Sequence, residues 1–212
     1  MSVARGDSPD NVASNRQKFL QEFSVSEADL AQPVQISRAG IEIVNMPGKY
    51  HNRDALITRQ NGLYLSVLTA DCAPVMLWSL EQPVIAAIHS GWQGSELDIL
   101  GKTIHELIHT LDVSPASLSM AIGPGLCQNN FEVGPEFEAK FPKQHLDPKP
   151  QSDRFYFDNN GYLQQRALDL GIPTDQIEVL SYCTYEDDQL FYSHRRDGLK
   201  TGRMMSVIGI NK

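Results

Sequence analysis

The chain has 212 residues, of which 41% are hydrophobic, and its 26 acidic and 18 basic residues give a net charge of −8. This length and composition predict one domain, residues 1–212, with a single core. The acidic charge disfavours bulk attraction to nucleic acid or to an anionic membrane surface. The apolar runs fall short of the roughly 20 residues that span a bilayer, and Met1 to Asp7 lack the apolar core of a signal peptide. We therefore expect a cytoplasmic protein that binds neither nucleic acid nor membrane.

Local patterns in the first half of the chain predict one helix followed by sheet. Ser8-Pro9 is typical of a helix start, and apolar residues at helical spacing predict a helix over residues 9–23. β-Branched residues around Gly40 predict a hairpin or bent strand pair over residues 34–44, and residues 45–52 read as a loop. Nearly continuous apolar runs at 63–68, 75–78 and 84–88 predict the strands of a central sheet covered on both faces.

The second half alternates helices and strands. Apolar residues recur at helical spacing over 97–111, so the helix predicted there begins soon after His89. A strand over 118–122 ends at a glycine- and proline-rich turn, Asp158 is the expected cap of a helix ending near Gly171, and strands are expected at 177–181 and 204–210. The alternation favours an α/β or α+β domain with a mixed β-sheet.

Two short segments hold the most reactive side chains. Cys72 ends the segment Thr69-Ala70-Asp71-Cys72, and His89 begins the segment His89-Ser90-Gly91-Trp92-Gln93-Gly94. A thiol and an imidazole brought together by the fold can share a metal, or the imidazole can activate the thiol as a nucleophile. A buried structural cysteine, a structural histidine, and a tryptophan that serves as a packing anchor are the simpler alternatives.

The other candidate groups are two cysteines and three arginines. Cys127 and Cys183 lie far apart in a chain with too few cysteines for a disulfide framework, so we interpret them as thiols or ligands. Three guanidiniums within nine residues are suited to binding phosphate or carboxylate, although surface exposure or internal ion pairs would explain them as well. These residues are Arg195, Arg196 and Arg203.

Several separate motifs resemble those of one family, in family order over roughly residues 5–210. They are Thr69-Ala70-Asp71-Cys72-Ala73-Pro74-Val75, Ala87-Ile88-His89-Ser90-Gly91-Trp92-Gln93-Gly94, Ile122-Gly123-Pro124-Gly125, Phe131-Glu132-Val133-Gly134, Cys183-Thr184-Tyr185, Ser193-His194-Arg195-Arg196-Asp197 and Thr201-Gly202-Arg203. On these motifs the chain is identified as a member of the YfiH family, whose members are also called laccase-domain proteins, polyphenol oxidases, peptidoglycan editing factors and purine nucleoside phosphorylases.

The resemblance implies a single α+β domain with a mixed β-sheet covered by helices. It also implies a catalytic metal, commonly zinc, held by two histidines and one cysteine, and a reaction in which phosphate displaces the purine of adenosine or inosine. Cys72 and His89 match two of those ligands. Copper is the metal implied by the polyphenol oxidase name, and a nucleoside and phosphate are the expected small-molecule partners.

The chain departs from the family pattern at three places. Ser37 stands where the upstream histidine ligand is expected, which predicts a weakened zinc site, with His51 as a substitute ligand. Gln93 replaces a family arginine, which removes a positive charge. The first matching segments, Gly6-Asp7 and Asn15-Arg16, lie near the start of the sequence, so we expect a divergent, N-terminally short member.

Four functions follow from these observations. The leading hypothesis is purine nucleoside phosphorolysis, with adenosine deamination as a related activity, in which the arginines orient phosphate and Cys72 and His89 polarise the substrate. The first alternative is a cysteine-dependent hydrolase or amidase with Cys72 as nucleophile and His89 as base. The second is a laccase-like polyphenol oxidase, disfavoured by having only six scattered histidines. The third is a non-catalytic nucleoside-binding module.

Overall fold

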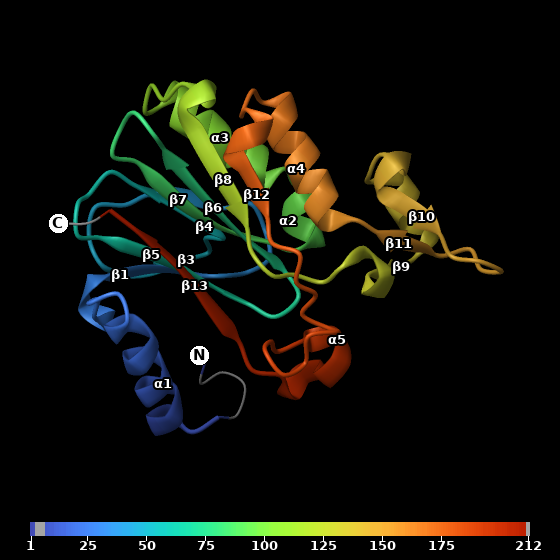
Figure 1. The fold of residues 1–212 in the computed structure, drawn as a ribbon, viewed down its shortest axis with the longest axis horizontal. Coiled ribbons are helices and arrows are strands. Elements are labelled where there is room, and N and C mark those ends of the chain that lie inside the picture. Colours follow the sequence, from blue (N-terminus) through green and yellow to red (C-terminus); the bar gives the residue numbers. More distant parts are fainter. Residues whose placement is uncertain (3–6, 211–212) are drawn as a thin grey trace.

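A six-stranded mixed sheet forms the centre of the fold in the computed structural model, which describes residues 1–2 and 7–210 (Figure 1). The strands lie in the order β12-β8-β6-β7-β4-β2, with parallel pairing at both edges and antiparallel pairing between them. Their bounds are Ile177–Val179, Leu118–Ile122, Ala73–Ser79, Ile85–Ser90, Ala55–Thr58 and Ile41–Ile43, respectively. Every residue of β7 is buried, as expected for a strand covered on both faces.

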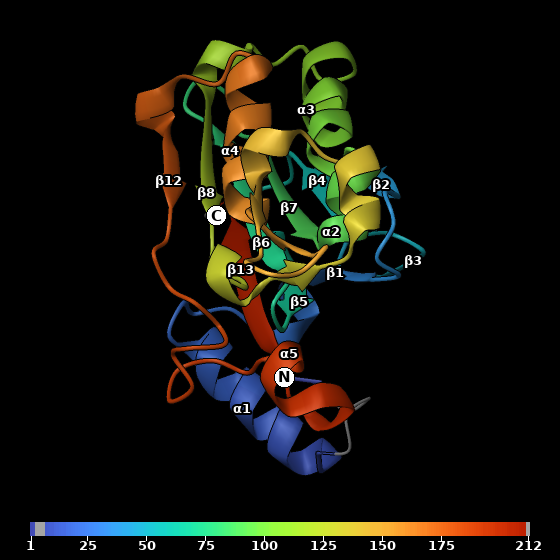
Figure 2. The same cartoon turned by 90° about the vertical axis from the view of Figure 1, so that its right-hand side faces the viewer.

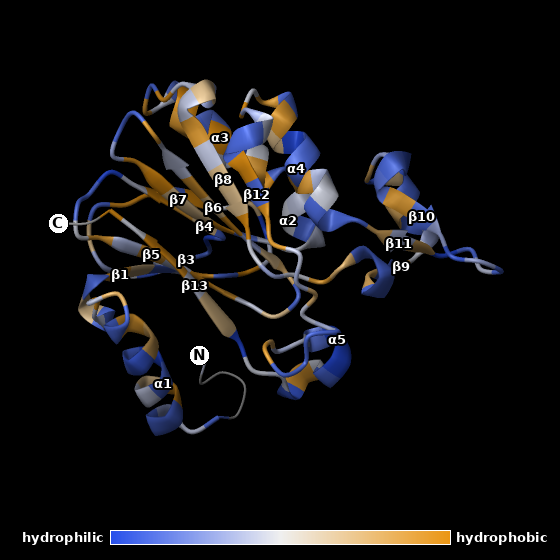
Figure 3. Ribbon diagram, in the orientation of Figure 1, coloured by the Kyte–Doolittle hydropathy of each residue, from blue (hydrophilic) through white to orange (hydrophobic). Residues whose placement is uncertain are grey.

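A second, four-stranded sheet packs against one face of the first. Its order is β13-β5-β1-β3, with bounds Met204–Gly209, Tyr64–Thr69, Leu30–Val34 and Gly48–His51, respectively. Leu65 and Val67 of β5 pack with Leu56 of β4 and Ala87 of β7 to form the core between the sheets. In Figure 3 the hydrophobic colour accordingly follows the strands.

Helices cover the outer faces of both sheets. α3 (Ile99–His109) and α4 (Asn159–Asp169) bury apolar side chains against the six-stranded sheet. α1 (Pro9–Gln21) lies on the far side, where Leu20 packs against Leu30 and Met205 of the four-stranded sheet. Figures 1 and 2 show the resulting helix-sheet-sheet-helix layers. None of the helices in the described ranges is both long and apolar enough to cross a membrane.

A small sheet projects beside these layers, as Figure 1 shows. Its strands β10 (Leu146–Pro148), β11 (Phe155–Phe157) and β9 (Glu132–Val133) carry an aromatic cluster centred on the fully buried Phe157. Two short helices, α2 (Trp92–Glu96) and α5 (His194–Asp197), begin within segments singled out in the sequence. The projecting sheet and α5 therefore bring side chains distant in sequence toward the ends of β6 and β7.

The predicted α+β class with a mixed sheet covered by helices is confirmed. Asp158 caps α4 by accepting a hydrogen bond from the Gly161 N–H at 2.9 Å. Two local predictions are wrong: β1 and β2 belong to different sheets and form no hairpin, and β3 lies inside the expected 45–52 loop. The strand at 63–68 belongs to the four-stranded sheet, which packs against the sheet of β6 and β7. Gly6, part of the predicted family start, lies outside the described residues.

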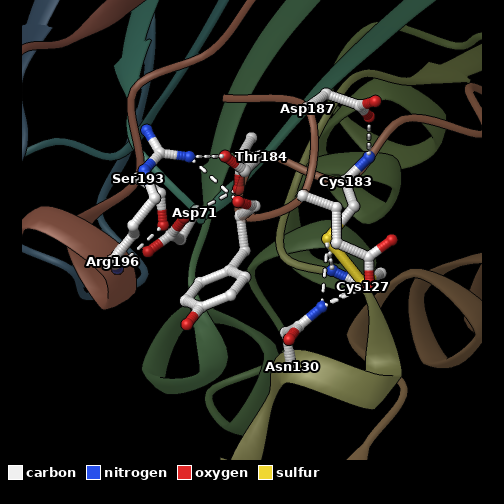
Figure 4. The surroundings of a disulfide bond; sticks show 10 residues. Asp71, Cys127, Asn130, Cys183, Thr184, Asp187, Ser193 and Arg196 are labelled. Carbon is white, nitrogen blue, oxygen red and sulfur yellow. Dashed lines mark hydrogen bonds between the residues drawn. A yellow bond between two sulfur atoms is a disulfide. The ribbon is translucent and has the colours of Figure 1, made fainter. Parts of the chain in front are cut away.

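Cys127 and Cys183 form a disulfide, so their interpretation as free thiols or ligands is wrong for this structure (Figure 4). Their Cα atoms lie 5.1 Å apart although 56 residues separate them in sequence. Sequence spacing could not reveal the pair, because a bridge between Gly125 and Cys183 brings the two segments together only in the folded chain. Cys72 is the free cysteine of the described chain.

Candidate active site

Strand pairing places Asp54, His89 and Cys72 in a row across β4, β7 and β6. In β6 and β7, Pro74 lies opposite His89, so Cys72, two residues earlier, is the diagonal neighbour of His89 on the same face. On the other side of β7, Ala55 pairs with Ile88, and the His89 N–H donates to the Asp54 carbonyl at 2.7 Å. The predicted proximity of Cys72 and His89 therefore follows from antiparallel register.

Asp54 is the residue that the sequence analysis missed. Its side chain is fully buried, and its Oδ1 lies 2.8 Å from His89 Nδ1. The backbone N–H groups of Ser37 and Arg38 donate to the same carboxylate at 2.9 and 2.8 Å. Burial by itself raises the pKa of Asp54, but the hydrogen bonds from His89 and the backbone outweigh it and lower the pKa below its usual value. Asp54 is therefore an anion that orients the imidazole.

The His89 ring is held between a carboxylate and a thiol. Burial lowers its pKa, but the neighbouring Cys72 and the hydrogen bond to Asp54 act in the opposite direction and raise the pKa to about 9. Because Nδ1 faces Asp54, Nε2 is the ring nitrogen left for Cys72 or for a bound molecule. The same arrangement can orient a metal ligand or hold the base of a nucleophilic cysteine.

The Cys72 sulfur lies directly against the backbone of Gly91. A Cβ atom on Gly91 would lie 2.8 Å from Cys72 Sγ, closer than two such atoms can approach. Gly91 also precedes α2, so the segment that follows His89 turns away and leaves room for the thiol. The glycine that follows His89 in the sequence motif is therefore needed to admit the Cys72 side chain.

Asp71 joins Cys72 to two distant segments. Its carboxylate accepts hydrogen bonds from the Thr184 hydroxyl at 2.7 Å and from the Arg195 backbone N–H at 2.6 Å. Its carbonyl accepts the Leu126 N–H at 2.9 Å, and its φ of 84° lies in the left-handed region, which non-glycine residues rarely adopt. Asp71 thus ties the Cys72 backbone to the loop after β8 and to the start of α5.

A cavity of about 360 Å³, here called the Cys72 cavity, opens beside the thiol. Its walls include the rings of Trp92 and Phe131, and His194 and Arg195 of α5 supply its polar edge. The Trp92 ring also lies 5.2 Å from that of Phe137, so the predicted packing role holds while one part of the residue lines the cavity. An aromatic wall beside the Arg195 guanidinium suits a flat heterocycle that carries or adjoins an anion.

A second cavity, of about 720 Å³, reaches the other side of the thiol. Ser37, His51, Cys72, His89, His194 and Arg203 are among its lining residues. Within the described part of the chain, however, no third histidine, cysteine or carboxylate joins Cys72 and His89 with all ligand atoms within 4.8 Å of one another. A serine hydroxyl is a poor zinc ligand, so the residues present do not fit a three-ligand zinc centre. Neither His51 nor Ser37 completes it in this arrangement.

The three predicted anion-binding arginines lie in different surroundings. Arg195 lines the Cys72 cavity, with its guanidinium 5.8 Å from the Phe131 ring centre and two N–H groups on the Glu132 carbonyl. Arg203 lines the larger cavity and donates to the Gly202 carbonyl at 2.7 Å. Arg196 directs all five N–H groups to other acceptors, namely Asp197 and the carbonyls of Thr184, Tyr185 and Phe191. Arg196 therefore organises its loop, whereas Arg195 lines the cavity beside Cys72.

Comparisons with known proteins agree on one family. A family model described as multi-copper polyphenol oxidoreductase laccase matches residues 1–211. A purine nucleoside phosphorylase of Deinococcus radiodurans is 34% identical over 208 residues, covering 97% of this chain and 80% of that protein. Another, of Bacteroides thetaiotaomicron, is 30% identical over 223 residues, covering 98% and 83%. The crystal structure of the Bacillus licheniformis hypothetical protein YfiH, 27% identical, matches 99% of this chain and 85% of that one with a TM-score of 0.93.

Proposed function

Because the chain belongs to the YfiH family of laccase-domain proteins, we propose that it is a purine nucleoside phosphorylase-type enzyme. The reaction would convert adenosine or inosine and phosphate to the free base and ribose 1-phosphate. The observation that carries the proposal is the Cys72 cavity, where two aromatic rings and Arg195 adjoin the partly buried Cys72, behind which lie the buried side chains of His89 and Asp54. Relatives named purine nucleoside phosphorylase support the same reaction. A cytoplasmic location belongs to this proposal.

In the proposed enzyme, the residues of the Cys72 cavity bind the substrates and His89 polarises the departing base. In the proposed complex the purine lies against Trp92 and Phe131, while Arg195 attracts phosphate to the open side of the cavity. His89, fixed through Nδ1 by Asp54, directs Nε2 toward the reacting end and hydrogen-bonds the departing base. Preorganised charge and position supply most of the rate enhancement in such a site.

The proposed mechanism contains no step on a metal. Zinc or copper bound to Cys72 and His89 would supply Lewis-acid chemistry, but the described residues offer these two good ligands and no third. Oxidation of phenols by several coppers is less well supported still, because it requires clustered histidines. The assay of the reaction therefore includes samples with and without added zinc.

The test is to incubate the protein with adenosine or inosine, with and without phosphate and zinc, and to separate the products by chromatography. We expect free base that depends on phosphate. Adenosine deamination would instead yield inosine without phosphate. Arg195→Ala should raise the KM for phosphate about 10- to 100-fold, as expected for loss of a charge-assisted hydrogen bond. Arg59→Ala, at an exposed arginine bonded to Gln82 and Leu111, is the matched control.

The absence of any product under all these conditions would refute phosphorolysis. A raised thermal midpoint with nucleoside, but no product over hours, would identify a non-catalytic nucleoside-binding module. A loss of activity in Arg59→Ala as large as that in Arg195→Ala would show that the effect is not local to the Cys72 cavity.

A second candidate function is cysteine-dependent hydrolysis of an amide, and the Asp54-His89-Cys72 row specifically favours it. An oriented imidazole beside a thiol is the arrangement that activates a nucleophilic cysteine. Iodoacetamide should then label Cys72 rapidly at neutral pH without reductant, and His89→Ala should abolish the rapid phase. The label is located by peptide mass spectrometry. An inert thiol, or equal rates in both proteins, would rule out this function.

A further inference from the structure

A second group of metal-ligating side chains lies where the loop that follows β8 meets the segment that begins at Cys183. The Cys127 and Cys183 sulfurs and a Glu186 carboxylate oxygen all lie within 4.8 Å of one another. Cys183 is buried, Cys127 is partly buried and Glu186 is exposed, so the group is anchored in the fold and reachable from solvent. Figure 4 shows the two cysteines with the Asn130 side chain directed toward them.

The side-chain amide of Asn130 lies close to all three of these groups. Asn130 Nδ2 is 2.6 Å from Glu186 Oε1, 3.1 Å from Cys127 Sγ and 3.7 Å from Cys183 Sγ. Two sulfurs and a carboxylate thus converge on the partial positive charge of a single amide group. A cation at the position of this NH₂ group would lie close to the same two sulfurs and the same carboxylate. Rotation of the Asn130 amide would turn its oxygen toward that cation.

The backbone holds the two cysteines together independently of the bond between their sulfurs. The Thr184 N–H donates to the Gly125 carbonyl at 2.9 Å. The Asp187 carboxylate accepts the Cys183 N–H at 2.8 Å, and the Asp187 N–H donates to the Cys183 carbonyl at 2.9 Å. Because these bonds do not involve the disulfide, reduction should leave both thiols facing Glu186.

We propose that the reduced Cys127-Cys183 pair, together with Glu186, binds a thiophilic divalent cation of the zinc class. A small-molecule dithiol or phosphine reductant supplies two electrons to the sulfur-sulfur bond, and two protons complete the two thiols. Zinc then binds both sulfurs as thiolates, and the two protons go to solvent. Two thiolates and a carboxylate are ordinary zinc ligands, and Asn130 or water completes a tetrahedral set. The disulfide and the metal are therefore alternative ways of joining the same two loops.

This site borders the proposed active site without sharing a ligand with it. Leu126, next to Cys127, lines the Cys72 cavity, and Thr184, next to Cys183, holds Asp71. Either form of the link therefore fixes the wall of that cavity. The proposal concerns metal binding alone, so it stands or falls independently of phosphorolysis.

The test uses Cys72→Ser protein, which removes the thiol of the other candidate site. The protein is reduced with a phosphine, stripped of metal with a chelator and dialysed against zinc, and zinc per chain is measured by elemental analysis. We expect about one equivalent in the reduced protein and none at this site in the oxidised protein. Cobalt in place of zinc should give thiolate-to-metal charge-transfer absorption.

Two variants locate the ligands. Even loss of an outer-shell partner costs about 10- to 100-fold in metal affinity, so adding Cys127→Ser should weaken binding at least that much. Glu186→Gln, at an exposed position, should also weaken zinc binding while leaving the fold intact. Asp188→Asn, at an exposed position nearby, should leave zinc binding unchanged. Equal zinc binding by reduced and oxidised protein, full binding by Cys127→Ser or Glu186→Gln, or a cobalt spectrum without the thiolate band would each overturn the proposal.

Discussion

Asp54→Asn should lower the kcat/KM of the proposed reaction by about 10²- to 10⁴-fold, the larger figure being that known for the same change in a serine protease triad. The Asp54 carboxylate accepts hydrogen bonds from His89 Nδ1 and from the backbone N–H groups of Ile36, Ser37 and Arg38. An asparagine has one acceptor oxygen, so its amide group must face at least one of these donors. The imidazole then loses its fixed tautomer and orientation.

Two measurements separate orientation from simple destabilisation. The tautomer of His89, followed by nitrogen NMR, should change in Asp54→Asn. The matched control is Asp98→Asn, because Asp98 also accepts backbone and guanidinium hydrogen bonds but lines neither cavity beside Cys72. This control should lower stability and leave kcat/KM unchanged. Folded Asp54→Asn protein with activity within tenfold of wild type would contradict the role given to Asp54.

The stability difference between the wild-type protein and Asp54→Asn should depend on pH. The pKa of His89 is raised from 6.5 to about 9 in the folded protein. Its contribution to the free energy of unfolding is therefore complete below pH 6.5 and is lost as the pH rises through 9. The pKa of Asp54 is lowered from 3.8, so its own contribution is lost only in acid. The difference between wild type and Asp54→Asn should be widest between these limits and narrow toward pH 9.

Local patterns predicted most single elements, but they could not predict how the strands pair. The helical period of α3 and the apolar runs of β6 and β7 depend only on residues that are close in sequence. These elements occur where expected. By contrast, Gly40 suggested a hairpin, although β1 pairs with β3 and β5 while β2 pairs with β4. Pairing between distant segments depends on the packing of both sheets, which short-range patterns do not encode.

The candidate site shows the same division. Cys72 and His89 stand out because each occupies a motif with its own glycine or proline punctuation. Asp54 stands alone before a short strand, and it becomes significant only when β4 lies antiparallel to β7. The sequence did hold one signal, a carboxylate directly before the short apolar run Ala55-Leu56-Ile57, because a residue that precedes a covered strand lies at the edge of the sheet. The Cys127-Cys183 pairing carried no comparable local signal.

Ser37→His should convert the two-ligand arrangement into a zinc site. Ser37 lines both cavities beside Cys72, and its backbone is fixed because its N–H donates to Asp54. Its φ of 56° lies in the left-handed region, where histidine occurs more often than most residues. A third imidazole or thiolate ligand is what separates weak binding from a stable centre. Zinc affinity should rise by at least about 10- to 100-fold, since even outer-shell changes have effects of that size.

The measurement must keep the second cysteine pair out of the result. Zinc per chain is therefore determined without reductant, with the Cys127-Cys183 disulfide intact. Ser37→Ala is the matched control and should gain nothing, while Ser37→His with Cys72→Ser should lose the added zinc. His51→Ala tests the substitute ligand, and unchanged zinc binding in that variant would exclude His51. If Ser37→His binds no more zinc than wild type, position 37 is not the missing ligand, and the site must be understood through Asp54, His89 and Cys72 alone.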